Sequence, residues 1–120
     1  MPNRDGSRTS VKHFFGDGEH DFDIVDAKWS LLIELEKTVG SVLPFFHRMQ
    51  AGDFRVTELR ELIRLALIGG GKTPGEAHRL VGTYFDLSPI AEHLPLAVAI
   101  TGAALFGVDP DGEVVNDAAA

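Results

Sequence analysis

The spacing of the apolar residues changes at Asp26, and this change constrains the fold more than any other feature of the sequence. From Val11 to Val25 apolar and polar residues tend to alternate, which is typical of a strand with one buried face. After Asp26 apolar residues recur every three or four positions, which is typical of amphipathic helices. A chain of 120 residues with this order predicts one domain in which a strand pair precedes a set of helices.

The alternating segment is predicted to form a hairpin, because the turn residues Gly16, Asp17 and Gly18 interrupt it. A turn at Asp17-Gly18 pairs Phe15 with His20, whereas a turn at Gly16-Asp17 shifts the pairing by two residues. Both registers put the same side chains on one face, namely Val11, His13, Phe15, His20, Phe22 and Ile24. The opposite face then carries Lys12, Glu19, Asp21 and Asp23 in solvent, with Phe14 as its apolar exception.

Four or five helices are expected between Asp26 and Gly107. Asp26, Ser41 and Thr57 are the predicted starts of the first three, and Gly40, Gly52 and the run Gly69-Gly70-Gly71 are their predicted ends. The first helix is expected to bury Trp29, Leu32, Ile33, Leu35 and Val39, and the third to leave Glu58 in solvent. Thr73-Pro74-Gly75-Glu76 is a capping box with proline at the first helical position, so it predicts the start of a fourth helix.

The last apolar segment contains Pro95, which removes a helical hydrogen bond, so we expect a kink or a fresh helix start near His93. This segment is apolar on nearly every side, which is typical of a helix that is central to a bundle or lies in an interface. The predicted fold class is therefore α+β, mainly α, with an N-terminal β-hairpin followed by a compact bundle of four to five helices. Residues 11–107 form the single expected domain, and residues 1–10 and 108–120 are expected to be flexible tails, the second of them acidic.

Composition excludes several classes of function. The chain has no cysteine, which excludes a disulfide scaffold, a thiolate zinc site and a cysteine nucleophile. Its net charge of −7, and the glutamates between the arginines of the third and fourth helices, argue against nucleic-acid binding. The longest apolar run, Leu94 to Phe106, is shorter than the roughly 20 residues of a bilayer span. The N-terminus shows no apolar stretch of the secretory type, so we expect a cytoplasmic protein without a membrane partner.

No motif supports catalysis, a cofactor or a metal ion. Gly69-Gly70-Gly71-Lys72-Thr73 resembles a phosphate-binding loop, but the first glycine of that motif is replaced by Ala66 within a helix. The acidic run from Asp17 to Asp23 lacks the glycine and the final carboxylate of a calcium loop. The five histidines lack the spacing of metal ligands, although His13 and His20 are expected to approach each other in the hairpin as a half-buried pair. We therefore predict a protein that is not an enzyme.

Three segments in order carry a resemblance to a known family: L-E-x-x-x-G at residues 35–40, R-x-x-L-I-G-G-G-x-T-P-x-E-A at residues 64–77, and Ala-Ala-Leu-Phe-Gly at residues 103–107. With the hairpin before them, they resemble the gene-transfer-agent small tail protein family, which is grouped with phage tail assembly chaperones. The resemblance covers about residues 11–107.

The resemblance implies a non-enzymatic tail assembly chaperone that binds tape-measure or tail tube proteins while a phage-like tail is built. It leaves open a structural tail tube component retained in the particle, which would place the chain in the particle rather than only in the cytoplasm. A small nucleotide-binding protein that uses Gly71, Lys72 and Thr73 is a third, weaker alternative.

A chaperone needs apolar surface for its partner, and two predicted helices offer it. The candidate partner-binding residues are Phe45, Phe46 and Met49 on the short second helix, and Val98 and Leu105 on the last helix. The alternative is that all five belong to the core. The sequence does not determine the oligomeric state, so self-association stays open.

Overall fold

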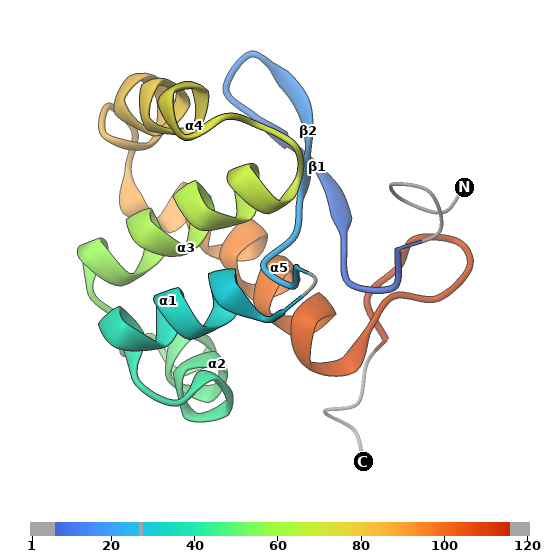
Figure 1. The fold of residues 1–120 in the computed structure, drawn as a ribbon. Coiled ribbons are helices and arrows are strands. Elements are labelled where there is room, and N and C mark those ends of the chain that lie inside the picture. Colours follow the sequence, from blue (N-terminus) through green and yellow to red (C-terminus); the bar gives the residue numbers. More distant parts are fainter. Residues whose placement is uncertain (1–6, 27, 116–120) are drawn as a thin grey trace.

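The computed structural model describes residues 7–26 and 28–115, and it confirms the predicted mainly α class of α+β fold. A two-stranded hairpin precedes the helices (Figure 1). The elements in chain order are β1 (Val11–Phe15), β2 (Gly18–Phe22), α1 (Ser30–Val39), α2 (Val42–Gln50), α3 (Val56–Gly69), α4 (Pro74–Leu80), the π-helical turn η2 (Val81–Phe85), the 3-10 turn η3 (Ile90–His93) and α5 (Leu94–Phe106).

The hairpin turns at Gly16-Asp17, the second of the two predicted registers. Phe15 pairs with Gly18, His13 with His20 and Val11 with Phe22. Gly16 has a φ of 70°, and a glycine at the first position of a two-residue turn adopts such a value without strain. The predicted faces are preserved because the shift is an even number of residues. Phe14 is 61% exposed as expected, and Lys12 lies 3.1 Å from the carboxylate of Asp21 across the strands.

The prediction that Asp23 lies in solvent on the acidic face of the hairpin is wrong. Asp23 follows β2 and is buried. Its carboxylate accepts hydrogen bonds from the Thr9 hydroxyl at 2.9 Å and from the Val25 N–H at 2.9 Å. Its own N–H donates to the carbonyl of Ala66 at 3.0 Å, so the end of the hairpin is joined to α3. A buried carboxylate with several donors is a satisfied structural group.

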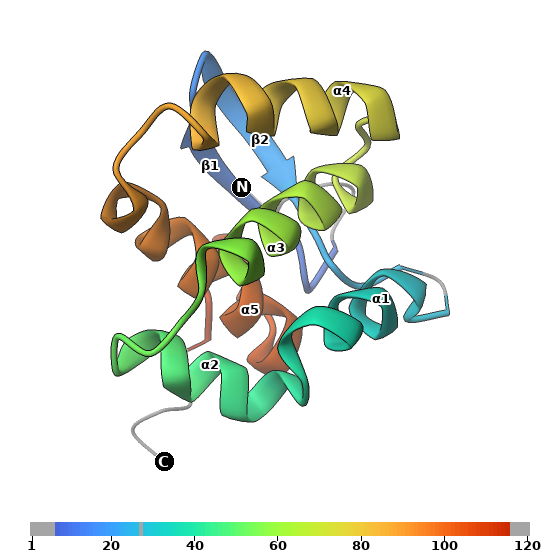
Figure 2. The same ribbon diagram turned by 90° about the vertical axis from the view of Figure 1, so that its left-hand side faces the viewer.

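Helix α3 runs between α4 on one side and α1 and α2 on the other, as two views at right angles agree (Figures 1 and 2). Thr73 starts α4 as predicted: its N–H donates to Glu76 Oε1 at 2.9 Å, and the Glu76 N–H donates to its hydroxyl at 3.1 Å. The predicted start of α1 at Asp26 is wrong, since this helix begins at Ser30. The start of α3 also differs, because Arg55 and not Thr57 is the N-cap residue.

The segment around Pro95 behaves as predicted. The 3-10 turn η3 ends at His93 and α5 begins at Leu94, so Pro95 lies in the first turn, where no helical hydrogen bond is lost. Helix α5 contacts α2, α3 and β1, which gives its apolar sides separate neighbours. It is therefore a central helix of the bundle.

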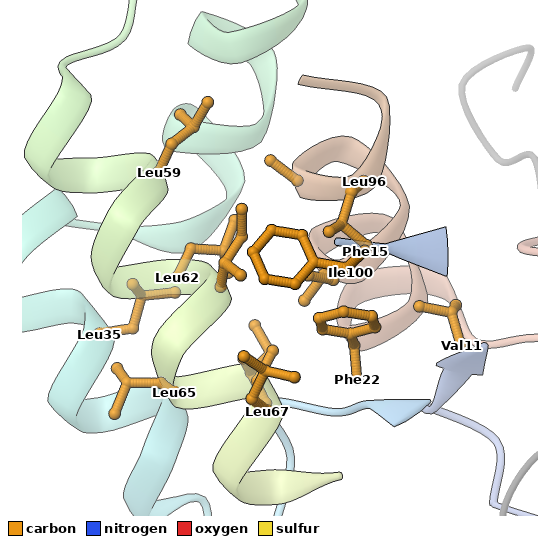
Figure 3. Close-up of a cluster of buried hydrophobic side chains, with 14 of the residues drawn as sticks. Val11, Phe15, Phe22, Leu35, Leu59, Leu62, Leu65, Leu67, Leu96 and Ile100 are labelled. Atoms are coloured by element: carbon orange, nitrogen blue, oxygen red, sulfur yellow. The ribbon is translucent and has the colours of Figure 1, made fainter. Parts of the chain in front are cut away.

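The core lies between the hairpin and α1, α3 and α5 (Figure 3). Large apolar side chains from all four elements meet there, and most are fully excluded from solvent. The labelled members are Val11, Phe15, Phe22, Leu35, Leu59, Leu62, Leu65, Leu67, Leu96 and Ile100. The hairpin is therefore part of the core rather than an appendage, because three of its side chains fill the space beside α5.

The described fold extends beyond the expected limits of residues 11 and 107. The N–H of Val108 donates to the carbonyl of Arg8 at 2.7 Å, and the N–H of Val115 donates to the carbonyl of Gly107 at 2.9 Å. Val108 is buried, and Val114 contacts the core. Hydrogen bonds and buried side chains thus join parts of residues 7–10 and 108–115 to the bundle, while the flexibility of the two predicted tails stays a prediction. The rest of both predicted tails, residues 1–6 and 116–120, lies outside the described residues.

Candidate functional site

The three candidate partner-binding residues of α2 are buried within the described fold. Phe45 and Met49 are fully excluded from solvent, and Phe46 is 5% exposed. Phe45 belongs to the main core, whereas the Phe46 ring lies edge-on to Phe106 of α5 with 5.6 Å between centroids. Adjacent side chains on a helix point about 100° apart. Here Phe45 points into the main core, and Phe46 points toward α5. Partner binding by these residues stays a prediction that requires α2 to move.

The other two candidates, Val98 and Leu105, lie on α5 and are half-buried. Val98 contacts the core. Because Val98 and Leu105 are only half-buried, part of each apolar side chain is exposed to solvent. The structure does not bring these residues together with the α2 candidates on one exposed surface.

The large apolar side chains that are exposed in the described chain lie elsewhere. They are Phe14, Trp29, Ile33, Leu43, Val56, Leu87 and Val115. The prediction that the first helix buries Trp29 and Ile33 is wrong, since both are exposed. Trp29 precedes the helix, and the buried side chains of the helix are Leu35 and Val39. Trp29 is exposed because it lies before the helix, and Ile33 is exposed although it lies inside it, since sequence periodicity does not say which apolar side chains another element covers.

A pocket of about 310 Å³ opens between the hairpin turn and the segment from η2 to η3. Its walls are aromatic, and three polar residues of the second segment converge on it. The lining residues are Phe14, Phe15, Gly16, Tyr84, Ser88, Glu92 and His93. Leu87, the most exposed large apolar residue described, is next to Ser88 in the chain. The pocket is an open one in which aromatic and polar side chains both line the walls.

His93 is the buried polar group of this pocket. Its ring stacks on Phe85 with 4.5 Å between centroids, and it forms a hydrogen bond with the backbone of Phe85. Its Nε2 atom is buried and has no partner among the described residues. Burial lowers the pKa of His93, which favours the neutral ring.

The predicted histidine pair of the hairpin is present, but the two rings do not bond to each other. His13 and His20 are cross-strand partners and both are half-buried. His20 Nε2 lies 2.8 Å from Asp17 Oδ1, and His13 Nδ1 lies 2.9 Å from the carbonyl of Phe14. The two rings therefore have separate partners rather than a shared site.

A buried ion pair joins the bundle at the start of α3. Arg48 donates to both carboxylate oxygens of Glu58, at 2.8 and 3.2 Å, and also to the carbonyls of Val39 and Asp53. Glu58 is 5% exposed, which corrects the prediction that it lies in solvent. Burial alone raises the pKa of Glu58, but the bonds from Arg48 and from the Arg55 N–H outweigh it and lower that pKa.

Two arginines of α3 are held in ion pairs, in keeping with the mixed charge expected of this surface. Arg60 donates to both carboxylate oxygens of Asp86, at 2.9 and 3.0 Å, and Arg64 donates to Glu61 at 2.6 and 2.9 Å. A surface that follows a phosphate backbone needs unpaired positive charge. The arrangement here is that of a mixed-charge, solubilising surface.

The glycine run at the end of α3 has a packing role in the described fold. A Cβ atom at Gly69 would lie 1.7 Å from the carbonyl oxygen of Asp23, and one at Gly70 would lie 1.9 Å from that of Asp21. These glycines let the hairpin approach the helix end, where the Asp23 N–H bonds to Ala66. The run follows a helix, whereas a phosphate-binding loop follows a strand.

No group of three His, Asp or Glu side chains in residues 7–26 and 28–115 is placed to hold a metal ion. Within the same residues, none of the helices has the length and apolar character needed to span a membrane. The described chain is a small, mainly helical α+β fold.

Comparison with protein families shows which family this mainly helical protein belongs to. Residues 8–107 match the family described as phage tail tube protein, GTA-gp10. The match covers most of the chain, and it spans the hairpin and every helix. The chain therefore belongs to this family of phage and gene-transfer-agent tail proteins, as the resemblance implied. Comparison with curated proteins and with solved structures found no match.

Proposed function

We propose that this chain is a structural component of the tail tube of a gene transfer agent or phage-like particle. The single observation that carries the proposal is the family match over residues 8–107, because it includes all secondary structure elements. The proposed role has no catalytic step and needs no cofactor. It replaces the assembly chaperone as the leading interpretation, since the family description names the tube.

The surface of the fold supports a role in assembly. A subunit of a tube must contact copies or neighbours on more than one side. The exposed apolar residues are divided in this way: Phe14 and Leu87 lie near the hairpin turn, while Trp29 and Ile33 lie at the start of α1. Exposed apolar residues on two separate parts of the fold are compatible with contacts to two neighbouring subunits.

A tail assembly chaperone that binds tape-measure or tail tube proteins is the second candidate. It is supported by Val98 and Leu105, which leave apolar surface on a helix that is otherwise central. If this role is correct, Val98→Gln with Leu105→Gln reduces co-purification of the tape-measure protein. The matched control is Leu43→Gln, because Leu43 is an exposed apolar residue of another helix.

Quantitative mass spectrometry of purified particles separates the two candidates. A tube component is present in many copies per particle, whereas a chaperone is absent or scarce. Particles should be purified through a density gradient so that free cytoplasmic protein is removed. Absence of the chain from infectious or transfer-competent particles would reject the tube role.

A further inference from the structure

Residues 108–115, here called the hook, form a small hairpin of their own after α5. The N–H of Asp109 donates to the carbonyl of Glu113 at 2.8 Å, and the N–H of Gly112 donates to the carbonyl of Asp109 at 2.9 Å. The Asp109 carboxylate accepts two further bonds, from the N–H groups of Asp111 and Glu113 at 3.0 and 2.9 Å. A proline at the second position of the turn suits this geometry. Because all of these bonds lie within the hook, they persist wherever the hook is placed.

The hook seats a valine in a notch of the bundle. Val114 contacts the core, and a Cβ atom at Gly102 of α5 would lie 3.1 Å from Val114 Cγ1 and 3.5 Å from Phe46 Cε1. The absence of a side chain at Gly102 therefore leaves room for the valine beside the Phe46 ring. The notch, formed by Gly102 and Phe46, is an apolar site whose occupant is part of the fold.

The second attachment of the hook is Val108. Its side chain is buried, and its N–H donates to the carbonyl of Arg8 at 2.7 Å. Pro110, Asp111 and Glu113 are exposed, and Figure 1 shows the hook at the edge of the molecule beside the N-terminal segment. A peripheral unit with few buried side chains opens at a lower free energy than the bundle unfolds. The hook can therefore leave its notch while the bundle stays folded.

One residue, Gly107, joins the hook to α5, which ends at Phe106. Gly107 has a φ of 88° and a ψ of 176°, a backbone region that is essentially restricted to glycine. The chain must reverse there, because Val114 returns to Gly102, about one helical turn before the end of α5. A hinge of one residue has no slack, and short hinges of this kind favour exchange of the hinged segment between copies.

We propose that the hook is exchanged between copies of this chain, so that Val114 of one copy occupies the notch of Gly102 and Phe46 in a second copy. The notch fits this segment in the closed molecule, and a second copy carries the same segment. The bonds within the hook and the contacts of its valines are the same in both forms, so the forms differ at the hinge, Gly107. Closure within one copy is favoured in dilute solution, and exchange is favoured at high concentration.

Each copy gives one hook and receives one, so two copies close into a dimer or many copies continue in a row. The family match ends at residue 107, so the hook lies outside it and its exchange does not follow from the family. A role of the exchange in linking tail subunits rests on the proposed tube function. The exchange itself is measured on the purified chain.

Introduced cysteines report the exchange directly, because the chain has none of its own. Full-length Gly102→Cys and Val114→Cys variants are incubated together and then treated with oxidised glutathione. The Val114 side chain lies against the Gly102 position, which is the proximity that a disulfide needs. A disulfide between positions 102 and 114 can join only two different copies in this mixture. We expect this product to increase with protein concentration, as measured by mass spectrometry of the linked peptides. Val115→Cys in place of Val114→Cys is the control, because Val115 is exposed.

Gly107→Ala tests the hinge without cysteines. Alanine resists the closed backbone conformation, so association should rise on the order of 10-fold, as measured by sedimentation. Gly40→Ala is the matched control, since Gly40 also ends a helix with a positive φ, 78°, and a Cβ there meets nothing within 4 Å. It should leave association unchanged. Adding Val114→Ser to Gly107→Ala should restore the monomer because the notch loses its apolar occupant, whereas adding Val115→Ser should not.

The inference is overturned if no disulfide joins positions 102 and 114 of different copies, if Gly107→Ala stays as monomeric as Gly40→Ala, or if its association survives Val114→Ser. Circular dichroism shows whether Gly102→Cys folds, and if it does not, the sedimentation series decides alone. Each of these results can occur with a correct tube role, because particle composition is measured separately. Conversely, hook exchange in the purified chain together with absence of the chain from particles would reject the tube role and leave the exchange standing.

Discussion

At the scale of single residues, stability depends on polar groups that the fold has buried. Glu58 and Asp23 look like solvent-exposed residues in the sequence, because charged positions beside apolar stripes are usually outside. The structure buries both, and in each case donors from distant segments satisfy the carboxylate. Local sequence carries no signal for such partners, since Arg48 is ten residues from Glu58 and Thr9 is fourteen residues from Asp23.

Removing the partner of Glu58 should destabilise the fold. Arg48→Met leaves a buried carboxylate without its cation, and loss of one member of a buried ion pair lowers the free energy of unfolding by about 3 kcal/mol. The measurement is urea unfolding followed by circular dichroism. Lys37→Met is the control, because its exposed pair with Glu34 contributes less than about 1 kcal/mol. Equal effects of the two substitutions would contradict the account of this ion pair.

His93 should make stability depend on pH below its ordinary pKa of 6.5. Burial lowers its pKa in the folded state, so the unfolded chain binds a proton first as the pH falls. The stabilising effect is complete above pH 6.5 and declines as the pH approaches the lower, folded-state value. His93→Phe should flatten the dependence of the unfolding free energy on pH below pH 6.5.

At the scale of elements, helix starts differ in how well local signals determine them. The Thr73 capping box has both of its reciprocal hydrogen bonds, whereas Thr57 lies inside α3 behind the true N-cap, Arg55. Thr73→Ala should therefore lower the free energy of unfolding by about 1 kcal/mol. Thr57→Ala should change it by less than about 0.5 kcal/mol. Thermal unfolding of both variants tests the assignment, and a larger loss for Thr57→Ala would refute the observed start of α3.

The junction of α3 with the hairpin should tolerate no side chain at Gly69. Gly69→Ala brings a methyl group against the Asp23 carbonyl, and overpacking of this kind destabilises by about 2–3 kcal/mol. Gly82→Ala is the matched control, since a Cβ there meets nothing within 4 Å. It should stabilise η2 by about 0.5–1 kcal/mol through the entropy of the unfolded chain. Amide exchange at Asp23 should accelerate in the first variant alone, because its N–H bonds to Ala66 across this junction.

At the scale of the whole molecule, sequence periodicity predicted the class and the order of elements but not all of the surface. The hairpin faces follow from alternation, and the break before α5 follows from the chemistry of Pro95, so both are local properties. Trp29 and Phe46 show the limit. Whether an apolar side chain is core or surface depends on which neighbouring helix covers it, and that information is not local. The pocket was missed for the same reason, since it joins residues about 70 positions apart in the chain.

The central claim, that this chain is a structural tail component, is tested most directly by counting its copies in purified particles. Quantitative mass spectrometry with isotope-labelled peptides of this chain gives the copy number relative to the capsid and other tail proteins. The account predicts many copies per particle, in constant proportion to the other tail subunits. A chain that is abundant in producing cells and absent from purified particles would contradict it and favour the assembly chaperone.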